Sequence, residues 1–236
     1  MNLYAARSNE IEIMDDLTSG GDEMVRTLKE LETINQLLGG NNVTIKGINR
    51  LIDRSRNKKW RIVDIGCGSG DMLKQIALWA RKKGIEVELI GVDANPHVVE
   101  YAVTNCQNFP EIEIRVENIF SDSFKQINCD ILTATLFLHH FKDEELVALF
   151  SQFQERASVG IVINDLHRHW FAHKAINILT SIFSKSKMVK NDAGISVLRG
   201  FRSAEIDTYM RFARITNYSL KWMWAFRWQL IIWNNK

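Results

Sequence analysis

The segment at residues 62–71 constrains this chain more than any other. It consists of a short apolar strand carrying Asp64, then Gly66, Gly68 and Gly70 at alternate positions, then the start of an amphipathic helix. Glycine lacks the Cβ atom that would block a tight turn or the close approach of a ligand to the backbone. Unpaired N–H groups at the start of the helix favour a polar ligand. The segment therefore predicts a cofactor loop at the carboxyl edge of a sheet.

Strands and helices alternate from residue 60 onwards, which is typical of an α/β protein with a doubly wound, mostly parallel sheet. Strands are expected at 61–65, 87–92, 112–116, 131–138 and 159–164, with two closing β-runs at 220–224 and 228–233. Helices are expected at 71–83, from 96, and at 143–156, 170–183 and 203–212.

The chain before the sheet is expected to be helical. Apolar residues recur at helical spacing over 22–38, where Asp22 would cap the helix, and 43–56 is a second candidate helix. We expect residues 1–57 to form a helical cap over the active-site edge. Residues 58–236 would then form the main domain, with a helical insertion at about 169–202.

The G-x-G-x-G spacing after an acidic strand resembles motif I of the class I S-adenosylmethionine (SAM) methyltransferases. A dinucleotide loop would need its third glycine one residue later. The resemblance extends over about residues 60–233 and implies a Rossmann-like, seven-stranded sheet closed by an antiparallel hairpin. It also implies SAM as cofactor and S-adenosylhomocysteine (SAH) as product.

Asp93 ends the second expected strand, where a carboxylate can accept hydrogen bonds from both ribose hydroxyls of a cofactor. Alternatively, Asp93 only caps the helix that begins near Pro96. The resemblance places the amino-acid end of SAM beside Asp64. It places the adenine after the third strand, beside Asn118 and Ile119, although the family commonly has Asp there.

Two further residues complete the expected cofactor site. Ala94 directly follows the ribose-binding candidate, and Leu136 lies at the end of the fourth expected strand, where it would line the same pocket.

Four histidines follow the fourth and fifth strands, at the edge where such sheets bind substrates: His139, His140, His167 and His169. Histidine titrates near neutral pH and can therefore take a proton from a methyl acceptor. We predict His140 or His167 as the catalytic base. The alternative for the first pair is a structural role beside Phe141.

A divalent cation is a further option, because His139, His140, His167 and Asp165 could converge at one edge of the sheet. The sequence has no cysteine ligand pair at metal-binding spacing, and no metal is expected.

The acceptor class follows from what stands after the fourth strand. Residues 135–140 contain no proline and no amide, unlike the Asn/Asp-Pro-Pro-aromatic turn of enzymes that methylate exocyclic nitrogens. The apolar and histidine-rich character favours a small aromatic or lipid-like hydroxylated acceptor. The expected helix at 170–183 is apolar around much of its circumference, so it is either buried, lines a tunnel or contacts a membrane.

Basic residues after that helix open a rival reading. Lys185, Lys187, Lys190, Arg199 and Arg202 could contact acidic headgroups or RNA, although such charges are commonly a solvated face. An RNA or protein methyltransferase and an inactive SAM-binding partner protein are therefore the alternatives to a small-molecule enzyme.

Bulk properties exclude several classes. A formal charge of +2 over 236 residues gives no large basic surface, so no DNA partner is expected. Cys67, Cys106 and Cys129 lack metal-cluster spacing, which favours reduced thiols and a cytoplasmic location. No leader and no membrane-spanning segment is expected. No oligomeric state is predicted.

The whole chain resembles the methyltransferases of ubiquinone and menaquinone biosynthesis. Arg7-Ser8, the run at 12–15 and the run at 164–168 resemble bacterial relatives encoded beside type III polyketide synthases. This resemblance implies a phenolic lipid or related polyketide, methylated on a hydroxyl or a ring carbon.

Overall fold

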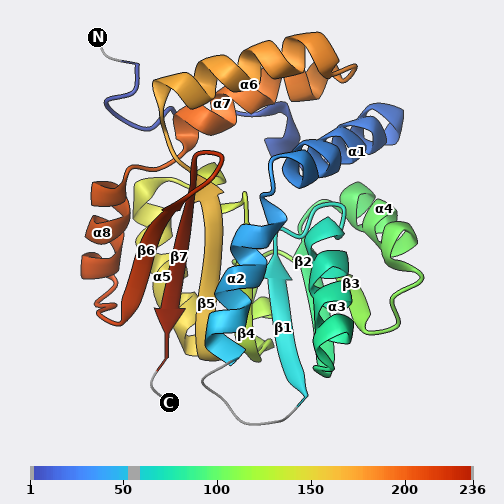
Figure 1. The fold of residues 1–236 in the computed structure, drawn as a ribbon, viewed down its shortest axis with the longest axis vertical. Helices are drawn as coiled ribbons and strands as arrows, with labels where there is room; N and C mark the ends of the chain where they lie inside the picture. The colour runs from blue at the N-terminus through green and yellow to red at the C-terminus, as the bar shows by residue number, and fades with distance from the viewer. Residues whose placement is uncertain (1–2, 53–58, 235–236) are drawn as a thin grey trace.

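A seven-stranded sheet with the order β3-β2-β1-β4-β5-β7-β6 forms the middle layer of the computed structural model, which describes residues 3–52 and 59–234 (Figure 1). The strands are β1 (Trp60–Ile65), β2 (Val87–Asp93), β3 (Ile112–Val116), β4 (Cys129–Thr135), β5 (Ala157–Leu166), β6 (Tyr218–Met223) and β7 (Arg227–Trp233). The first five strands are parallel, whereas β7 is antiparallel to β5 and β6. The predicted fold class is confirmed.

Helices cover both faces of this sheet. They are α1 (Gly21–Leu37), α2 (Asn41–Ile52), α3 (Asp71–Lys83), α4 (Pro96–Cys106), α5 (Asp143–Arg156), α6 (Trp170–Phe183), α7 (Lys187–Arg199) and α8 (Ser203–Phe212). Short 3-10 turns are η1 (Ile13–Asp15), η2 (Phe124–Gln126) and η3 (Leu138–His140). The closing strands and most helices lie within a few residues of the predicted ranges.

Two apolar cores flank the sheet because successive strand residues point to opposite faces. In β1, Ile62 packs with α2 and α3, whereas Val63 and Ile65 pack with α5 and α8. The segment α2 contacts the sheet directly, since a Cβ atom on Gly47 would lie 2.4 Å from Val162 Cγ1 of β5. The predicted domain boundary at residues 57/58 lies outside the described residues.

The helices α1, α6 and α7 lie above the carboxyl edge of the parallel strands (Figure 1). Two carboxylates of α1 join it to the N-terminus of α7. Glu30 Oε1 accepts from the Lys185 amide at 2.9 Å, and Glu23 Oε1 accepts from the Lys187 amide at 2.8 Å. A carboxylate at a helix N-terminus satisfies unpaired N–H groups and complements the helix dipole.

Three predicted elements need correction. The cap of α1 is Gly20 rather than Asp22, and the predicted helix at 43–56 begins at Asn41 and is described to Ile52. The fourth strand stops at Thr135 rather than at residue 138. The reason is that Leu136 takes a φ of 54° and the chain turns into η3, which places two histidine rings at the sheet edge.

The basic stretch after α6, part of the predicted helical insertion at about 169–202, contains a full helix, α7. Gly194 lies inside it, at the contact with α6, where a Cβ atom would lie 2.5 Å from Asn177 Oδ1. The glycine thus permits close helix packing and does not break the helix. Arg199, predicted to belong to a basic surface patch, is buried at the end of α7.

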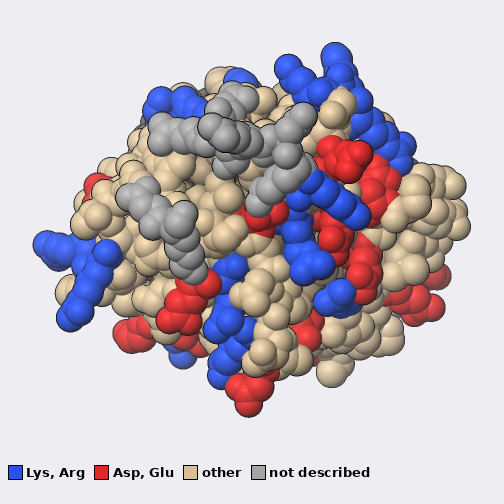
Figure 2. Space-filling view, turned by 90° about the horizontal axis from the view of Figure 1, so that it is seen from below, with Lys and Arg blue, Asp and Glu red and all other residues tan. Residues whose placement is uncertain are grey.

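None of the described helices is long and apolar enough to span a membrane. On the face seen from below, Lys and Arg lie interspersed with Asp and Glu and do not gather into a single-sign patch (Figure 2). The ion pair between Arg81 and Glu111, with Nε and Oε1 2.7 Å apart, is one example of opposite charges lying side by side.

Candidate active site

The three glycines of the loop after β1 all take positive φ angles, of 63°, 52° and 75° for Gly66, Gly68 and Gly70. L-residues rarely adopt this region, so the loop requires glycine. A Cβ atom on Gly66 would lie 2.0 Å from the Phe137 ring, and one on Gly70 would lie 2.6 Å from Cys106 Sγ. A Cβ on Gly68 would meet nothing within 4 Å. The middle glycine therefore faces open space that a ligand can approach.

Asp93 lies at the end of β2 and points towards this loop. Its Oδ2 accepts from the Gly68 amide at 3.2 Å, and its Oδ1 accepts from the Asn95 amide at 3.0 Å. Helix α4 is capped by Asn95, whose side chain accepts from the His97 and Val98 amides. Since Asn95 supplies the cap, Asp93 remains available to a ligand. Burial raises the pKa of Asp93.

Asp64, near the end of β1, is buried and has one side-chain donor, the Thr133 hydroxyl, 2.6 Å from Oδ1. Burial raises its pKa to about 7; Asp71 and Asp93 add to the effect, and the Thr133 hydrogen bond opposes it. A cationic ligand beside Asp64 would therefore favour the ionised carboxylate.

The other predicted cofactor contacts lie around the same space. Ile119 is buried and Asn118 is exposed, with Asn118 Oδ1 accepting from the Phe120 amide at 2.9 Å. Leu136 keeps its unusual φ while its amide donates to the Asn164 carbonyl at 2.8 Å. Ala94 lines the cavity directly after Asp93.

One cavity of about 1560 Å³ joins these groups. It is lined by Gly66, Gly68, Asp64, Asp93, Ala94, Asn118, Ile119, Leu136, His139 and His140. Apolar side chains from α1, α6 and the residues that flank η3 also line it, among them Leu28, Leu31, Phe137, Phe141, Phe171, Ile176 and Leu179. Gly70 does not line the cavity; it caps α3 behind the loop.

His139 is buried and rigidly held. Its Nδ1 lies 2.7 Å from Asp165 Oδ1, and Asp165 Oδ2 accepts from the Leu138 amide at 2.8 Å. Burial opposes ionisation of Asp165, but His139 and the Leu166 amide together lower its pKa. The Asp165 carboxylate thus engages Nδ1 of His139 and leaves Nε2 on the opposite side of the ring.

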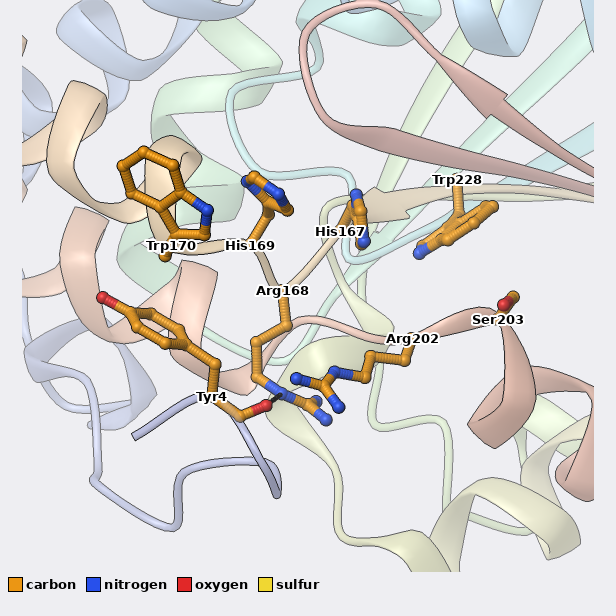
Figure 3. Close-up of a pocket in the computed structure, with 8 residues that line it drawn as sticks. All are labelled: Tyr4, His167, Arg168, His169, Trp170, Arg202, Ser203 and Trp228. Atoms are coloured by element: carbon orange, nitrogen blue, oxygen red, sulfur yellow. Dashed lines mark hydrogen bonds between the residues drawn. The ribbon is translucent and has the colours of Figure 1, made fainter. Parts of the chain in front are cut away.

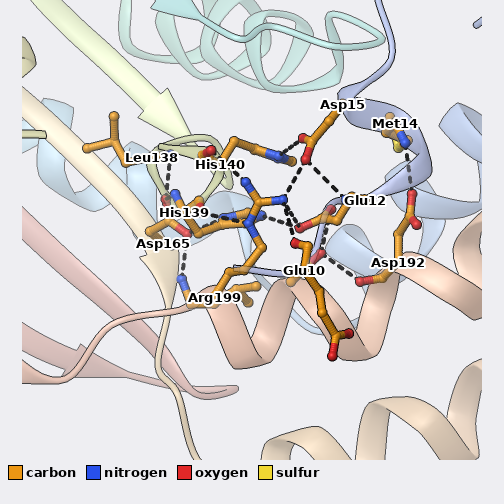
Figure 4. A network of polar contacts seen from close by, with 12 residues as sticks. Glu10, Glu12, Met14, Asp15, Leu138, His139, His140, Asp165, Asp192 and Arg199 are labelled. Atoms are coloured by element: carbon orange, nitrogen blue, oxygen red, sulfur yellow. Dashed lines mark hydrogen bonds and ion pairs between the residues drawn. The ribbon is translucent and has the colours of Figure 1, made fainter. Parts of the chain in front are cut away.

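His140 lies beside it, with the two rings 4.3 Å apart between centroids (Figure 4). Its Nδ1 lies 2.6 Å from Asp15 Oδ1, and Asp15 Oδ2 pairs with Arg199 Nη1. Burial opposes ionisation of Asp15, but the hydrogen bonds from His140 and Arg199 lower its pKa well below the usual range. The sequence predicts His140 as one of two candidate bases and does not reveal its partners.

Glu12 completes this cluster and was missed as a site residue. It is 4% exposed, and its Oε1 lies 3.8 Å from His139 Nε2. One ligand atom from each of Glu12, His139 and His140 lies within 4.8 Å of the other two, so this set could hold a metal ion. It differs from the predicted set, because Asp165 only supports His139 and His167 lies elsewhere.

His167 lines a separate pocket of about 570 Å³, with Arg168, His169 and Trp228 among its walls (Figure 3). The Trp222 indole Nε1 donates to His167 Nδ1 at 3.2 Å. Burial, followed by nearby positive groups, lowers the pKa of His167 to about 4. The structure therefore does not bring the second predicted base together with the glycine loop.

Comparison with known proteins agrees with this geometry. A family model for the methyltransferase domain matches residues 62–160, from β1 into β5. No curated protein matches the chain.

Three solved structures share the fold. The plantazolicin methyltransferase BpumL in complex with SAH is 15% identical with a TM-score of 0.63, and the match covers 91% of this chain and 92% of that chain. Magnesium protoporphyrin IX methyltransferase (ChlM) from Synechocystis PCC 6803, with bound SAM, is 12% identical with a TM-score of 0.60, covering 97% and 100%.

The CMeT domain of the citrinin polyketide synthase is 14% identical with a TM-score of 0.60. The match covers 79% of this chain but 50% of that chain, so this chain spans half the length of that relative.

The matched residues, the strand order and the glycine loop define a class I SAM-dependent methyltransferase domain. The activity that this domain indicates is SAM-dependent methyl transfer.

Proposed function

We propose that this enzyme methylates a small hydrophobic acceptor, at a phenolic, quinol or polyketide-like hydroxyl or at an activated ring carbon. The observation that carries the proposal is the shared cavity. The glycine loop, Asp93 and a histidine pair open into one space whose remaining walls are largely apolar. Such a space suits a cofactor and a small apolar molecule held side by side.

The cofactor residues are assigned as follows. Gly66, Gly68 and Gly70 shape the loop, and the open space over Gly68 fits the close approach of SAM. Asp93 accepts from the ribose hydroxyls, and Asp64 faces the ammonium of the amino-acid end. When bound, SAM supplies an electrophilic methyl group on a sulfonium.

The adenine is assigned to the pocket formed by Ala94, Asn118, Ile119 and Leu136. Asn118 Oδ1 accepts only one protein hydrogen bond, from Phe120, which leaves a lone pair for the adenine amine.

Apolar side chains of α1 and α6 favour a small hydrophobic acceptor over a nucleotide. Ile176 and Leu179 of α6 line the cavity, as do Leu28 and Leu31 of α1. The names of two relatives support the same class, because plantazolicin and magnesium protoporphyrin IX are themselves small molecules.

Of the two predicted bases, His140 is the one that lines this cavity. Its Nδ1 is engaged by Asp15, so its Nε2, when free, can accept the proton of an acceptor hydroxyl. His167 belongs to the second pocket and receives no role in the reaction.

The rival is an RNA or protein acceptor. Lys185, Lys187 and Lys190 are exposed, but Arg199 is buried in ion pairs and cannot contribute to a basic surface. The basic patch without Arg199 is smaller, which weakens the case for an RNA or protein acceptor.

The test is transfer of labelled methyl groups from SAM into a bacterial extract, followed by separation into organic-soluble, RNA and protein fractions. Label in the organic fraction, absent with Asp93→Ala, is the expected result. Label in RNA that disappears with Lys187→Glu and Lys190→Glu would overturn the proposal and support the rival.

The outer face of α6 suggests where the acceptor comes from. Ile178, Ile182 and Phe183 are 61%, 65% and 75% exposed, and α6 carries no acidic residue. With Lys174 and Lys185 nearby, we propose peripheral contact with an anionic membrane surface.

Vesicles of phosphatidylcholine with and without phosphatidylglycerol test this contact by co-sedimentation. We expect binding to the anionic vesicles that Ile178→Ser with Ile182→Ser abolishes. A matched control is Leu78→Ser on α3, a residue that is 48% exposed. Equal binding by all variants would contradict the contact. The three cysteines are free and buried, consistent with the proposed cytoplasmic location.

A further inference from the structure

Three lone-pair atoms converge beside the proposed acceptor space with no donor between them. Nδ1 of His139 and Nδ1 of His140 are each engaged by an aspartate, which leaves Nε2 of each ring free. The third atom is Oε1 of Glu12. The ligand atoms of the three residues lie within 4.8 Å of one another, and Glu12 Oε1 lies 3.8 Å from His139 Nε2.

Glu12 Oε1 has no hydrogen-bond partner among the described residues, although its side chain is only 3% exposed. The other oxygen, Oε2, accepts from the Ser196 hydroxyl at 2.9 Å. Leaving a buried carboxylate oxygen without a donor or cation costs on the order of 1–3 kcal/mol or more. A bound cation would remove that cost.

Both imidazoles carry the partner that metal-binding histidines usually have. Asp165 lies 2.7 Å from Nδ1 of His139, and Asp15 lies 2.6 Å from Nδ1 of His140 (Figure 4). A carboxylate on the far nitrogen fixes the tautomer, orients the ring and makes Nε2 a better ligand.

The charge of the cluster also favours a cation. Glu12, Asp15 and Asp165 contribute three carboxylates, whereas Arg199 contributes one guanidinium, which pairs with Asp15. Arg199 Nη1 lies 3.7 Å from Glu12 Oε1, beyond hydrogen-bonding distance. Three carboxylate groups therefore face one guanidinium in a largely buried site.

Further charged groups around the cluster, among the described residues, add no unpaired positive charge. Asp192 adds a carboxylate whose oxygens accept from the Ile13 and Met14 amides. Arg7, which donates to the His139 carbonyl, is paired with Asp143.

We propose that Glu12, His139 and His140 bind a divalent transition-metal ion. Two imidazoles and one carboxylate suit Zn²⁺, Fe²⁺ or Co²⁺ better than Mg²⁺ or Ca²⁺. Metal–ligand bonds of about 2.0–2.2 Å need only small side-chain shifts to close the present separations.

A three-residue site leaves coordination positions open. Since the site lines the shared cavity, an acceptor oxygen would complete the coordination. The inference rests on the proposed function and sharpens it: with the ion bound, His140 acts on the acceptor as a ligand and not as a free base.

The test uses the full-length chain without a histidine tag, stripped of metal by chelation, with Co²⁺ as the probe. Visible absorption and calorimetry should show one Co²⁺ per chain. Glu12→Gln and His140→Gln should each weaken binding at least about tenfold, and Asp15→Asn should weaken it about 10- to 100-fold through the ring orientation.

Matched controls are Glu10→Gln, an exposed neighbour, and His167→Gln in the second pocket, both of which should bind Co²⁺ like the wild type. Unchanged SAM affinity and circular dichroism establish that each variant is folded. Absence of Co²⁺ binding by the wild type, or equal binding by wild type and Glu12→Gln, overturns the metal site.

The two proposals fail separately. Organic-phase labelling without Co²⁺ binding leaves the proposed function intact and the histidines metal-free. Co²⁺ binding without organic-phase labelling leaves the metal site intact and removes the acceptor class.

Discussion

The two sides of the cavity are built in opposite ways. The cofactor side lies in residues 60–119 with the addition of Leu136, and its site residues lie at or close to the ends of strands of the sheet. The acceptor side, residues 6–17, 137–143 and 171–199, brings together three segments far apart in the chain. Asp15 and Arg199, for example, are paired across 184 positions. A site encoded by neighbouring residues leaves a motif in the sequence, whereas a site assembled by packing does not.

The two sides also differ in the forces that hold them. On the cofactor side, backbone geometry dominates: positive-φ glycines, a helix N-terminus and the amide of Gly68 on Asp93. On the acceptor side, buried side-chain ion pairs dominate, with Arg199 donating to the carbonyls of His139 and His140 as well as to Asp15. Changes to one side should therefore leave the other largely intact.

The largest expected effect tests that independence through Arg199→Met. Removing one member of a buried ion pair leaves Asp15 without its guanidinium partner and should cost about 3–5 kcal/mol of unfolding free energy, measured in urea. SAM affinity of the folded fraction should stay within a factor of two of wild type.

Arg202→Met, at an exposed position, is the control and should change neither quantity. A large loss of SAM affinity in Arg199→Met would show that the two sides are coupled and break the comparison.

Asp93→Ala is the reciprocal test on the cofactor side. The loss of two charge-assisted hydrogen bonds to ribose should weaken SAM binding at least about 100-fold, with little change in stability. Calorimetric titration with SAM measures it. Asp122→Ala, at a surface acid paired with Lys125, should bind SAM normally. Unchanged affinity in Asp93→Ala would refute the ribose assignment.

A smaller effect is expected from pH through Asp64. Its pKa, raised by burial to about 7, should fall when the cationic end of SAM binds, so binding releases a proton. SAM affinity should therefore rise about five- to tenfold from pH 6 to pH 7.5, since the limit is tenfold per pH unit. This range lies below the pKa of an α-amino group, about 7.7–8.0. Asp64→Asn should flatten the profile, and a persisting slope would remove the assignment.

The smallest effect concerns the pocket outside the shared cavity. The pKa of His167 is lowered to about 4, below the ordinary histidine pKa of about 6.5. Between about pH 6.5 and pH 4, the unfolded chain therefore binds a proton at His167 that the folded chain does not bind. Stability should thus fall as pH falls through this window. Chemical unfolding at pH 7 and pH 5 should show a larger loss for wild type than for His167→Gln. An equal loss in both proteins would contradict the buried neutral imidazole.

The same contrast explains what the sequence could predict. Motif I and the strand–helix alternation predicted the parallel sheet, and the position of Asp93 at a strand end placed it beside the loop. His167 was misplaced because β5 runs to Leu166, two residues beyond the predicted end, and His167 then forms a further β-bridge with Phe201. Its ring is carried past the edge towards the tryptophans of the closing strands.

The partners of His140 could not be predicted from residue spacing. Asp15 precedes it by 125 positions, and Arg199 looked like one member of a solvated basic stretch. Only the formation of α7, whose internal Gly194 reads as a break, brings Arg199 under η3. Helix packing, which no local pattern encodes, therefore sets the position of Arg199.

The carboxylate contacts between α1 and α7 have a consequence for chimeric enzymes made from this protein and a relative. Glu23 and Glu30 satisfy amides at the start of α7, so α7 transplanted without α1 would lose its N-terminal carboxylates. The two helices and the N-terminal segment that carries Glu12 and Asp15 should therefore be exchanged together. A chimera that exchanges residues 7–38 and 170–199 as a pair should swap acceptor preference while retaining the native SAM module.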